Sequence, residues 1–266
     1  MGLNSGDPLP SPFKVFERNR VVWRRSSVHM IAGQPGSQKT VLMLNIVDRM
    51  GKIPTLYISS DSDDFTVASR VYAMRSGETV ERAEEIISKD PAVAYDTLRE
   101  WDHVRFSFNS APTIDHIVSE LDAMTMINGE PPHHTVVDIL MDVDYEGASE
   151  MNLWALMNEF KVLAREYNTA FTIVHHASEG AKGEPCPPRS AIMGKANQLP
   201  TLILTLNGND DSIDVAVVKN RFGKADLTGR TFTKFPSDPA RCKVQEPNPE
   251  AGSTINAQAD WFKVKA

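Results

Sequence analysis

The chain has 266 residues, of which 41% are hydrophobic and 24% charged, as in a globular protein with one good-sized domain and tails. No apolar run approaches the roughly 20 residues of a membrane-spanning helix, and no apolar signal region is evident. We therefore expect a cytoplasmic protein without a membrane partner. The net charge of −7 argues against a broad basic face for nucleic acid. Cys186 and Cys242 lack metal-ligand spacing and are expected to be reduced thiols.

Residues 1–25 contain three prolines and show no clear periodicity, which predicts an N-terminal arm or linker. Within it, residues 14–25 carry five basic residues against one acid, and the aromatic residues are Phe13, Phe16 and Trp23. Two interpretations stay open. The aromatic residues pack on the core or on a neighbouring subunit, or the basic residues contact DNA.

The rest of the chain first alternates between strand and helix patterns. Strands are expected at 26–32, 55–59, 104–108, 134–141 and 170–174, and helices at 39–50, 65–76, 79–89, 113–127 and 150–167. This alternation predicts an α/β fold with a mostly parallel central sheet and helices on both faces. Later strands, joined by turns, predict C-terminal antiparallel hairpins and are expected at 201–206, 213–219 and 231–235. The domain is thus expected to span 26–236, with a C-terminal tail at 237–266.

A phosphate-binding loop is expected between the first strand and the first helix. It matches the P-loop pattern G-x-x-x-x-G-K-[ST] at three of four fixed positions and consists of Gly33, Gln34, Pro35, Gly36, Ser37, Gln38, Lys39 and Thr40. Such a loop turns its backbone N–H groups and a helix N-terminus towards a phosphate. Lys39 is expected to reach the β- and γ-phosphates of ATP, and the Thr40 hydroxyl to ligate Mg²⁺. Gln38 replaces the second glycine, so its side chain must point away from the nucleotide.

An acidic residue in a later strand completes the expected magnesium site. Asp138 lies inside the apolar run 134–141, and Asp142 follows it. Ligands of α/β sheets bind at the carboxyl ends of the strands, where both acids would lie. We favour Asp138, because a carboxylate within an apolar strand destabilises the fold unless it has a functional partner.

With these motifs in order, the chain resembles the RecA-like ATPase domain of the DnaB family of hexameric replicative helicases, and the related RepA-type and phage-encoded ATPases, over about residues 28–235. Residues 56–61, Leu-Tyr-Ile-Ser-Ser-Asp, are similar to the family's strand ending in Ser-Leu-Glu. The family's Glu polarises the attacking water, so the resemblance implies this role for Asp61. Residues 159–167 resemble the family's Leu-Lys-x-Leu-Ala-Lys-Glu helix. The next strand ends where the family senses the γ-phosphate, which implies His176 as the sensor and His175 as second choice.

Two further segments extend the resemblance. Residues 188–194 resemble the family's Arg-Gly-Ser-Ser-Ala-Ile segment, and residues 217–223 match its Lys-x-Arg-x-Gly hairpin. That hairpin reaches into the neighbouring subunit's ATP site, so Lys219 and Arg221 are implied to act there in trans. Without the resemblance, these two residues would be interpreted as a solvated turn. A metal site built from the histidine pairs at 133–134 and 175–176 has little support, because no acidic or cysteine spacing accompanies them.

The resemblance implies a homo-oligomer, a hexameric ring or a filament, that hydrolyses ATP with Mg²⁺ and acts on single-stranded DNA in replication or recombination. The family's DNA-contacting loops correspond to 143–149, without a basic residue, and 177–189, where Lys182 and Arg189 are offset by two acids. Neither loop predicts a strong phosphate grip. Two alternatives stay open: a RecA- or RadA-like recombinase or annealing ATPase, and a regulatory or loader ATPase that acts on protein partners. The acidic net charge and Asp61 suit the latter.

Overall fold

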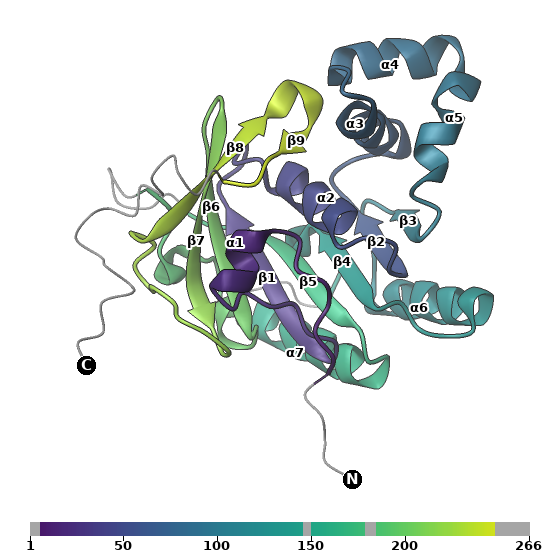
Figure 1. The fold of residues 1–266 in the computed structure, drawn as a ribbon. Coiled ribbons are helices and arrows are strands. Elements are labelled where there is room, and N and C mark those ends of the chain that lie inside the picture. Colours follow the sequence, from purple (N-terminus) through teal and green to yellow (C-terminus); the bar gives the residue numbers. More distant parts are fainter. Residues whose placement is uncertain (1–5, 146–149, 179–184, 248–266) are drawn as a thin grey trace.

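The computed structural model describes residues 6–145, 150–178 and 185–247, whose strands form one sheet of nine (Figure 1). The strand order is β3-β2-β4-β5-β1-β6-β7-β8-β9. The strands are β1 (Ser27–Gly33), β2 (Thr55–Ser59), β3 (Val104–Phe108), β4 (His134–Asp138), β5 (Ala170–His176), β6 (Leu202–Gly208), β7 (Ser212–Asn220), β8 (Phe232–Asp238) and β9 (Lys243–Val244).

The six strands from β3 to β6 in this order pair in parallel, and β7, β8 and β9 continue the sheet antiparallel. This confirms the predicted fold class, a mostly parallel α/β sheet with C-terminal antiparallel hairpins. Because parallel strands end together, we call the edge where β1, β2, β4, β5 and β6 end the carboxyl edge, and the opposite one the amino edge.

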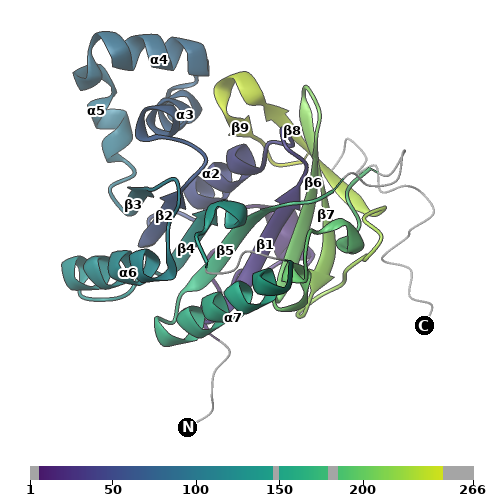
Figure 2. The same ribbon diagram turned by 180° about the vertical axis from the view of Figure 1, so that it is seen from behind.

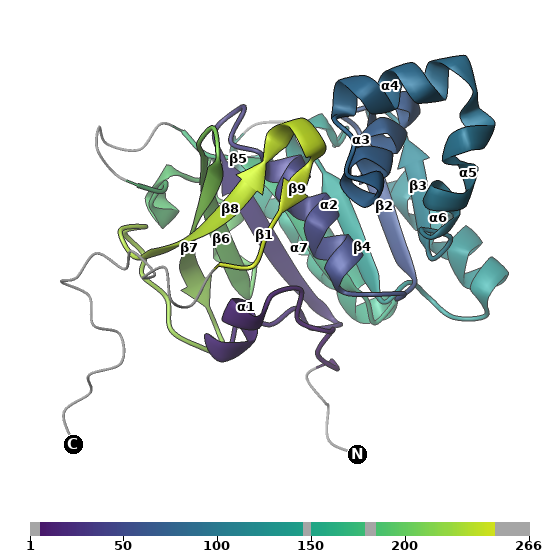
Figure 3. The same ribbon diagram turned by 45° about the horizontal axis from the view of Figure 1, so that its top comes forward.

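Helices cover both faces of the sheet (Figures 1, 2 and 3). Their bounds are α2 (Lys39–Arg49), α3 (Asp64–Ser76), α4 (Val80–Lys89), α5 (Pro91–Arg99), α6 (Ile114–Asn128) and α7 (Glu150–Glu166). On one face, α2 and α3 share a buried cluster with Ile31 and Tyr57. On the other, α6 and α7 share a second cluster with Met30 and Leu56. Neighbouring strand residues thus serve opposite cores, which is why the parallel strands are apolar throughout.

The strand expected at 134–141 is shorter than predicted. β4 ends at Asp138, and Leu140–Asp142 form a short 3₁₀ helix, η1. The apolar run continues past the strand because Ile139 packs in the core beneath α2, whereas Leu140 packs in the core beneath α7. Helix α5 lies in a segment for which the sequence patterns predict no element.

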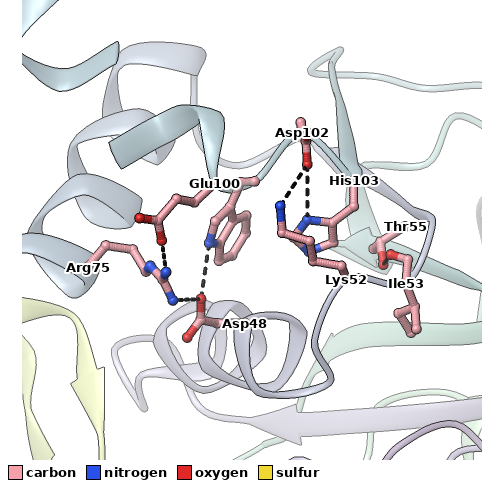
Figure 4. Close-up of polar contacts among 9 residues, drawn as sticks. Asp48, Lys52, Ile53, Thr55, Arg75, Glu100, Asp102 and His103 are labelled. Atoms are coloured by element: carbon pink, nitrogen blue, oxygen red, sulfur yellow. Dashed lines mark hydrogen bonds and ion pairs between the residues drawn. The ribbon is translucent and has the colours of Figure 1, made fainter. Parts of the chain in front are cut away.

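Helices α3, α4 and α5 form a small helical unit around Tyr72, Ala73, Ala83 and Ala94. This unit is attached to the far end of α2 through Asp48, as Figure 4 shows. The Asp48 carboxylate accepts hydrogen bonds from Arg75 Nη1 at 3.1 Å and from Trp101 Nε1 at 3.1 Å. Arg75 also pairs with Glu100. A second ion pair nearby, Lys52 with Asp102, is far more exposed.

The N-terminal arm, described from residue 6 to 25, contains α1 (Lys14–Arg18) and packs on the chain's own core. Phe13, Phe16 and Trp23 are all buried, with the first two rings 5.0 and 5.3 Å from Phe235 of β8. The carboxylate of Glu246 accepts hydrogen bonds from the backbone N–H groups at the start of α1. The arm and the C-terminal segment therefore hold each other against the sheet.

The C-terminal segment stays in contact with the domain well past residue 236. After β8 come η4 (Pro239–Arg241) and β9, and Asn45 of α2 hydrogen bonds to the backbone of Cys242 and Val244, both at 2.9 Å. The rest of the expected tail, 248–266, lies outside the described residues. Cys186 and Cys242 are buried free thiols. In the described ranges, no helix is both long and apolar enough to cross a bilayer.

Candidate nucleotide site

The P-loop connects β1 to α2 at the carboxyl edge, so it begins with the last residue of β1 and ends in the first turn of α2. Helix α2 starts without a side-chain cap and without an acidic residue in its first turn. By contrast, α3, α4, α5 and α6 are each capped by a side chain, those of Asp63, Thr79, Asp90 and Thr113. An uncapped helix N-terminus keeps its backbone N–H groups available for an anion.

Two glycines let other backbone segments approach the loop closely. A Cβ at Gly33 would lie 2.4 Å from Ser37 Oγ, and one at Gly208 would lie 3.0 Å from the Ser37 carbonyl carbon. Ser37 is only 4% exposed, and its hydroxyl finds no hydrogen-bond partner among the described residues. A buried hydroxyl of this kind leaves a polar group ready for a ligand.

Gln38, which replaces the second glycine of the pattern, adopts a left-handed backbone conformation with φ 64°. This region favours glycine, which explains the usual preference at this position. Here the side chain is anchored instead: Nε2 donates to the carbonyl of Asn209 at 2.7 Å, and Oε1 accepts from Ser237 Oγ at 3.2 Å. Because both partners lie on the β6–β7 turn and β8, the Gln38 side chain points out of the loop.

Lys39 is 8% exposed, and its ammonium folds back onto the loop. Nζ donates to the carbonyls of Gly33 at 3.2 Å and Gln34 at 2.8 Å. Burial lowers the pKa of Lys39, while the carboxylates of Asp138 and Asp61 act in the opposite direction. A cation in this position is therefore partly desolvated and suited to a bound anion.

Thr40 and Asp138 meet beneath the loop. The Thr40 hydroxyl donates to Asp138 Oδ2 at 2.9 Å, and the Tyr57 hydroxyl donates to the same oxygen at 2.8 Å. Asp138 is 4% exposed, so burial raises its pKa, although both hydrogen bonds act to lower it. A carboxylate and a hydroxyl in contact at the carboxyl edge are oxygen ligands of the kind that Mg²⁺ takes, so these residues fit the ion.

Asp61 and His176 lie around the same loop. Asp61 follows β2 and is exposed, yet its charge acts on the pKa values of Lys39, Asp138 and His176, which places all four groups near one another. His176 is the last residue of β5 and pairs in register with Gly33. Burial lowers the pKa of His176 first, and the Lys39 cation lowers it further.

His175 and Asp142, the second choices, differ in their surroundings. His175 is fully buried. Its Nε2 lies 3.1 Å from the backbone carbonyl of Met193, so His175 contacts the segment that follows β5 in the chain. Burial lowers its pKa to about 4. Asp142 lies in η1, near enough for its charge to raise the pKa of His176.

Lys219 and Arg221 do not join these residues. Lys219 pairs with Ile203, which pairs with Met30 in the middle of β1, whereas the P-loop begins at the last residue of β1, Gly33. The three-residue offset from Met30 to Gly33 corresponds to about 10 Å along the strands. Lys219 Nζ donates instead to the carbonyls of residues 197 and 198, at 3.3 and 2.6 Å. Burial, followed by the cations of Arg189 and Arg221, lowers the pKa of Lys219 to about 8.

Two further sequence-based expectations concern a histidine metal site and the loops that would contact DNA. His134 starts β4 at the amino edge, whereas His175 and His176 end β5 at the carboxyl edge, so the two histidine pairs are at opposite ends of the sheet. Within the described ranges, no three His, Cys, Asp or Glu side chains gather as a metal site. Of the expected DNA-contacting loops, residues 146–149 and 179–184 lie outside the described residues, among them Glu179, Lys182 and Glu184.

Two contacts of Asp138 were missed from the sequence. Tyr57 binds its carboxylate, and the Ser60 hydroxyl donates to its backbone carbonyl at 3.0 Å while accepting from the Ile139 N–H at 2.8 Å. A tyrosine inside an apolar strand is read as core, and a serine at a strand end as turn. Neither residue carries a signal of its own; only the register of β2 with β4 brings them together.

Comparison with known proteins finds a family and relatives for this chain. Residues 6–182 match a family model described as an AAA domain. The chain is 32% identical over 245 residues to the Gene 65 protein of Mycobacterium phage L5, covering 87% of this chain and 90% of the relative. It is 29% identical over 215 residues to the Gene 65 protein of Mycobacterium phage D29, covering 76% and 92%.

Solved structures share the fold at low sequence identity. One solved structure, of an ATPase domain, superposes with a TM-score of 0.79 at 14% identity, covering 92% of this chain and 94% of that one. The structure of a DnaB-like replicative helicase, described with its interactions with primase, gives a TM-score of 0.75 at 15% identity, covering 90% and 62%. The chain thus belongs to the AAA domain family and has the RecA-like fold of DnaB-type helicase ATPase domains.

Proposed function

We propose that the chain is an ATP-dependent motor acting on DNA, a DnaB-like helicase core that hydrolyses ATP at its subunit interfaces while bound to single-stranded DNA. The observation that carries this proposal is the separation of two groups of residues. The P-loop, Thr40 and Asp138 lie at the carboxyl edge, and Lys219 and Arg221 lie towards the amino edge. In a head-to-tail oligomer, one surface of each subunit contacts a different surface of the next, so the two groups would meet across the interface.

The first group would hold the nucleotide. ATP with Mg²⁺ supplies the phosphoanhydride bond whose hydrolysis drives movement. The backbone of residues 33–40 would cradle the phosphates, and Lys39 would exchange its loop carbonyls for β- and γ-phosphate oxygens. Thr40 and Asp138 would hold the metal ion. Asp61 would orient the attacking water, and His176 would contact the γ-phosphate from the end of β5.

The second group would act on the neighbouring subunit. Lys219 is the second-to-last residue of β7, and Arg221, which is exposed, directly follows the strand. A cation supplied in trans stabilises the charge that develops on the transferred phosphoryl group and can raise the rate by about 10³–10⁵. Each chain would then need a neighbour to complete its site, which agrees with a ring or filament.

The test is the ATPase rate with and without single-stranded DNA, with Lys39→Ala as the inactive control. The motor proposal predicts stimulation by DNA and binding that weakens with salt. An ATPase that neither responds to DNA nor binds it at low salt contradicts the proposal. Strand displacement, as opposed to strand pairing, then separates a helicase from a recombinase.

A second candidate is a regulatory ATPase that uses nucleotide as a switch and acts on protein partners. Two observations favour it: Asp61 stands where the helicase family has a longer Glu, and the net charge is −7. It predicts slow turnover that DNA leaves unchanged and a nucleotide-dependent protein complex. The same ATPase measurement therefore decides between the two.

A further inference from the structure

The Lys-Asn-Arg-Phe-Gly motif at 219–223 contains more than its two cations. The proposed function uses Lys219 and Arg221, which leaves Asn220, Phe222 and Gly223 without a role. Each of these three residues contacts the N-terminal arm of the same chain. The motif is therefore also a junction between the arm and the β7–β8 connection, residues 221–231.

Asn220 makes the central contact of this junction. Its Nδ2 donates to the backbone carbonyl of Arg20 at 3.0 Å, and its Oδ1 accepts from the Phe222 N–H at 3.0 Å. The one side chain thus fixes the start of the β7–β8 connection and binds it to the arm. It stands directly between the two cations in the sequence.

Gly223 allows the arm to come this close. A Cβ there would lie 2.6 Å from Asn220 Nδ2, 3.1 Å from the Asn19 carbonyl oxygen and 3.2 Å from the Arg20 Cβ. Two of these three neighbours are the arm itself, so a side chain at position 223 must displace either the arm or the Asn220 amide. Glycine is needed here for space.

Phe222 contributes a third contact, because the guanidinium of Arg24 lies over its ring at 4.7 Å from the centroid. The arm that makes these contacts is itself held firmly. Its buried aromatic residues pack against β8. Within the arm, Pro8 and Arg24 form an antiparallel backbone bridge. The junction therefore connects the cation-bearing turn to a fixed part of the domain.

We propose that Asn220 is a positioning residue for trans catalysis, which clamps the start of the β7–β8 connection to the arm and so fixes where Arg221 points. This inference rests on the proposed trans role of the two cations. Stabilising a transition state requires charges held in place before the reaction, and a displacement of about 1 Å can lower a rate by about 100-fold. The backbone of Arg221 is held on one side by its bond to Thr201 at 2.9 Å, and Asn220 supplies the hold on the other.

The first test compares Asn220→Ala with the unaltered protein. We expect kcat for ATP hydrolysis to fall about tenfold, while KM and the dissociation constant for nucleotide change less than about twofold, because the chain's own P-loop is untouched. Arg25→Ala is the matched control: it removes another contact of the arm, the bond from Arg25 Nε to the Asn168 carbonyl at 2.6 Å, and should leave kcat unchanged. An equal loss in both variants would overturn the proposal in favour of general loosening of the arm.

The second test mixes subunits. Lys39→Ala chains cannot use their own P-loop but carry an intact junction, so they should restore turnover at the P-loops of Asn220→Ala neighbours. Arg221→Ala mixed with Lys39→Ala tests the trans role itself. If Arg221→Ala is rescued and Asn220→Ala is not, the positioning proposal fails alone. If neither is rescued although all variants assemble, the trans mechanism fails with it.

Gly223→Ala keeps the proposal testable if Asn220→Ala does not fold. It adds one methyl group at the junction and leaves the Asn220 side chain in the sequence. We expect the same fall in kcat and the same rescue by Lys39→Ala. Unaltered kcat in a folded Gly223→Ala variant would contradict the close fit on which the clamp depends.

Discussion

The Thr40 hydroxyl and the Asp138 carboxylate are joined by a hydrogen bond of 2.9 Å, although 98 residues separate them in the chain. Tyr57 donates to the same oxygen, so the charge of Asp138 is held by two neutral hydroxyls in a buried position. Burial dominates and raises the pKa of Asp138. A buried carboxylate with a raised pKa is thus retained at the expense of stability, as expected of a residue kept for binding a cation.

Asp138→Asn should abolish most of the ATPase activity and stabilise the fold. Asparagine still accepts both hydrogen bonds, but it removes the charge that would hold Mg²⁺, so we expect activity to fall by about 100-fold or more. Because the folded-state pKa is raised, ionisation destabilises the native state once the pH exceeds the unfolded value of about 3.9. The variant's gain in unfolding free energy should therefore grow as pH rises above about 4 and level off above the raised folded-state pKa, measured by urea denaturation. A loss of stability at pH 7 would contradict this interpretation.

Asp61→Glu should raise kcat, because the longer side chain brings the carboxylate closer to the position that the helicase family uses. Asp61→Asn should lower kcat by about 100-fold or more, the usual contribution of a base acting on the attacking nucleophile. Asp61 is exposed and makes little contribution to packing, so nucleotide affinity should stay close to that of the unaltered chain in both variants. Steady-state ATPase assays paired with nucleotide titrations distinguish these effects. Normal turnover in Asp61→Asn would remove Asp61 from the mechanism.

The ATPase rate should fall as pH rises through about 8. The pKa of Lys219 is lowered to about 8 by burial and by the neighbouring cations of Arg189 and Arg221, so on the proposed mechanism one of the two trans cations is lost above this pH. Lys219→Arg keeps its charge and should give a flat profile to about pH 10. Stability should move the other way: the unfolded chain holds the Lys219 proton up to about 10.4, so unfolding free energy from this group rises between about pH 8 and 10. A rate profile that is identical in Lys219→Arg would show that another group titrates.

Gln38→Gly and Gln38→Ala should differ in stability by about 1–2 kcal/mol in favour of glycine. Both variants lose the hydrogen bonds to Asn209 and Ser237, but only alanine keeps a Cβ at a left-handed position. Gln38→Ala should be less stable than the unaltered chain by about 1–3 kcal/mol, from two hydrogen bonds. Thermal and urea denaturation give both values. Equal stability of the two variants would mean that the loop relaxes from its left-handed conformation.

The helical unit of α3, α4 and α5 should depend on Asp48 and not on the exposed ion pair beside it (Figure 4). Asp48→Ala removes the acceptor of two hydrogen bonds, from Arg75 and Trp101, and should lower the unfolding free energy by about 1–3 kcal/mol. Lys52→Ala breaks the pair with Asp102, in which both side chains are more than half exposed, and should change it by less than about 1 kcal/mol. Hydrogen exchange in α3 and α5 should rise only in Asp48→Ala. Equal effects would assign the anchoring to apolar packing.

The strands and the P-loop could be predicted because apolar runs bounded by Gly and Pro specify them locally. Helix α5 had a usable signal, since Asp90 caps it and Pro91 occupies its first turn, but the same Asp-Pro pair also starts turns. The sequence carries no signal for the end of β4, because Ile139 and Leu140 continue the apolar run, each packed in a different core. What depends on register was hidden altogether, including the Tyr57–Asp138 bond and the distance of Lys219 from its own P-loop.

On the proposed trans mechanism, the sheet would give each chain two half-sites that face opposite neighbours. On the proposed mechanism, a solitary chain is catalytically incomplete, and specific activity should climb with protein concentration until assembly saturates. A linear oligomer leaves one half-site unpaired at each end, whereas a closed ring leaves no half-site unpaired. ATPase activity per chain at saturation should therefore increase with the length of a linear oligomer, whereas a closed ring should show full activity per chain. Comparing this activity between short and long assemblies distinguishes a ring from a filament.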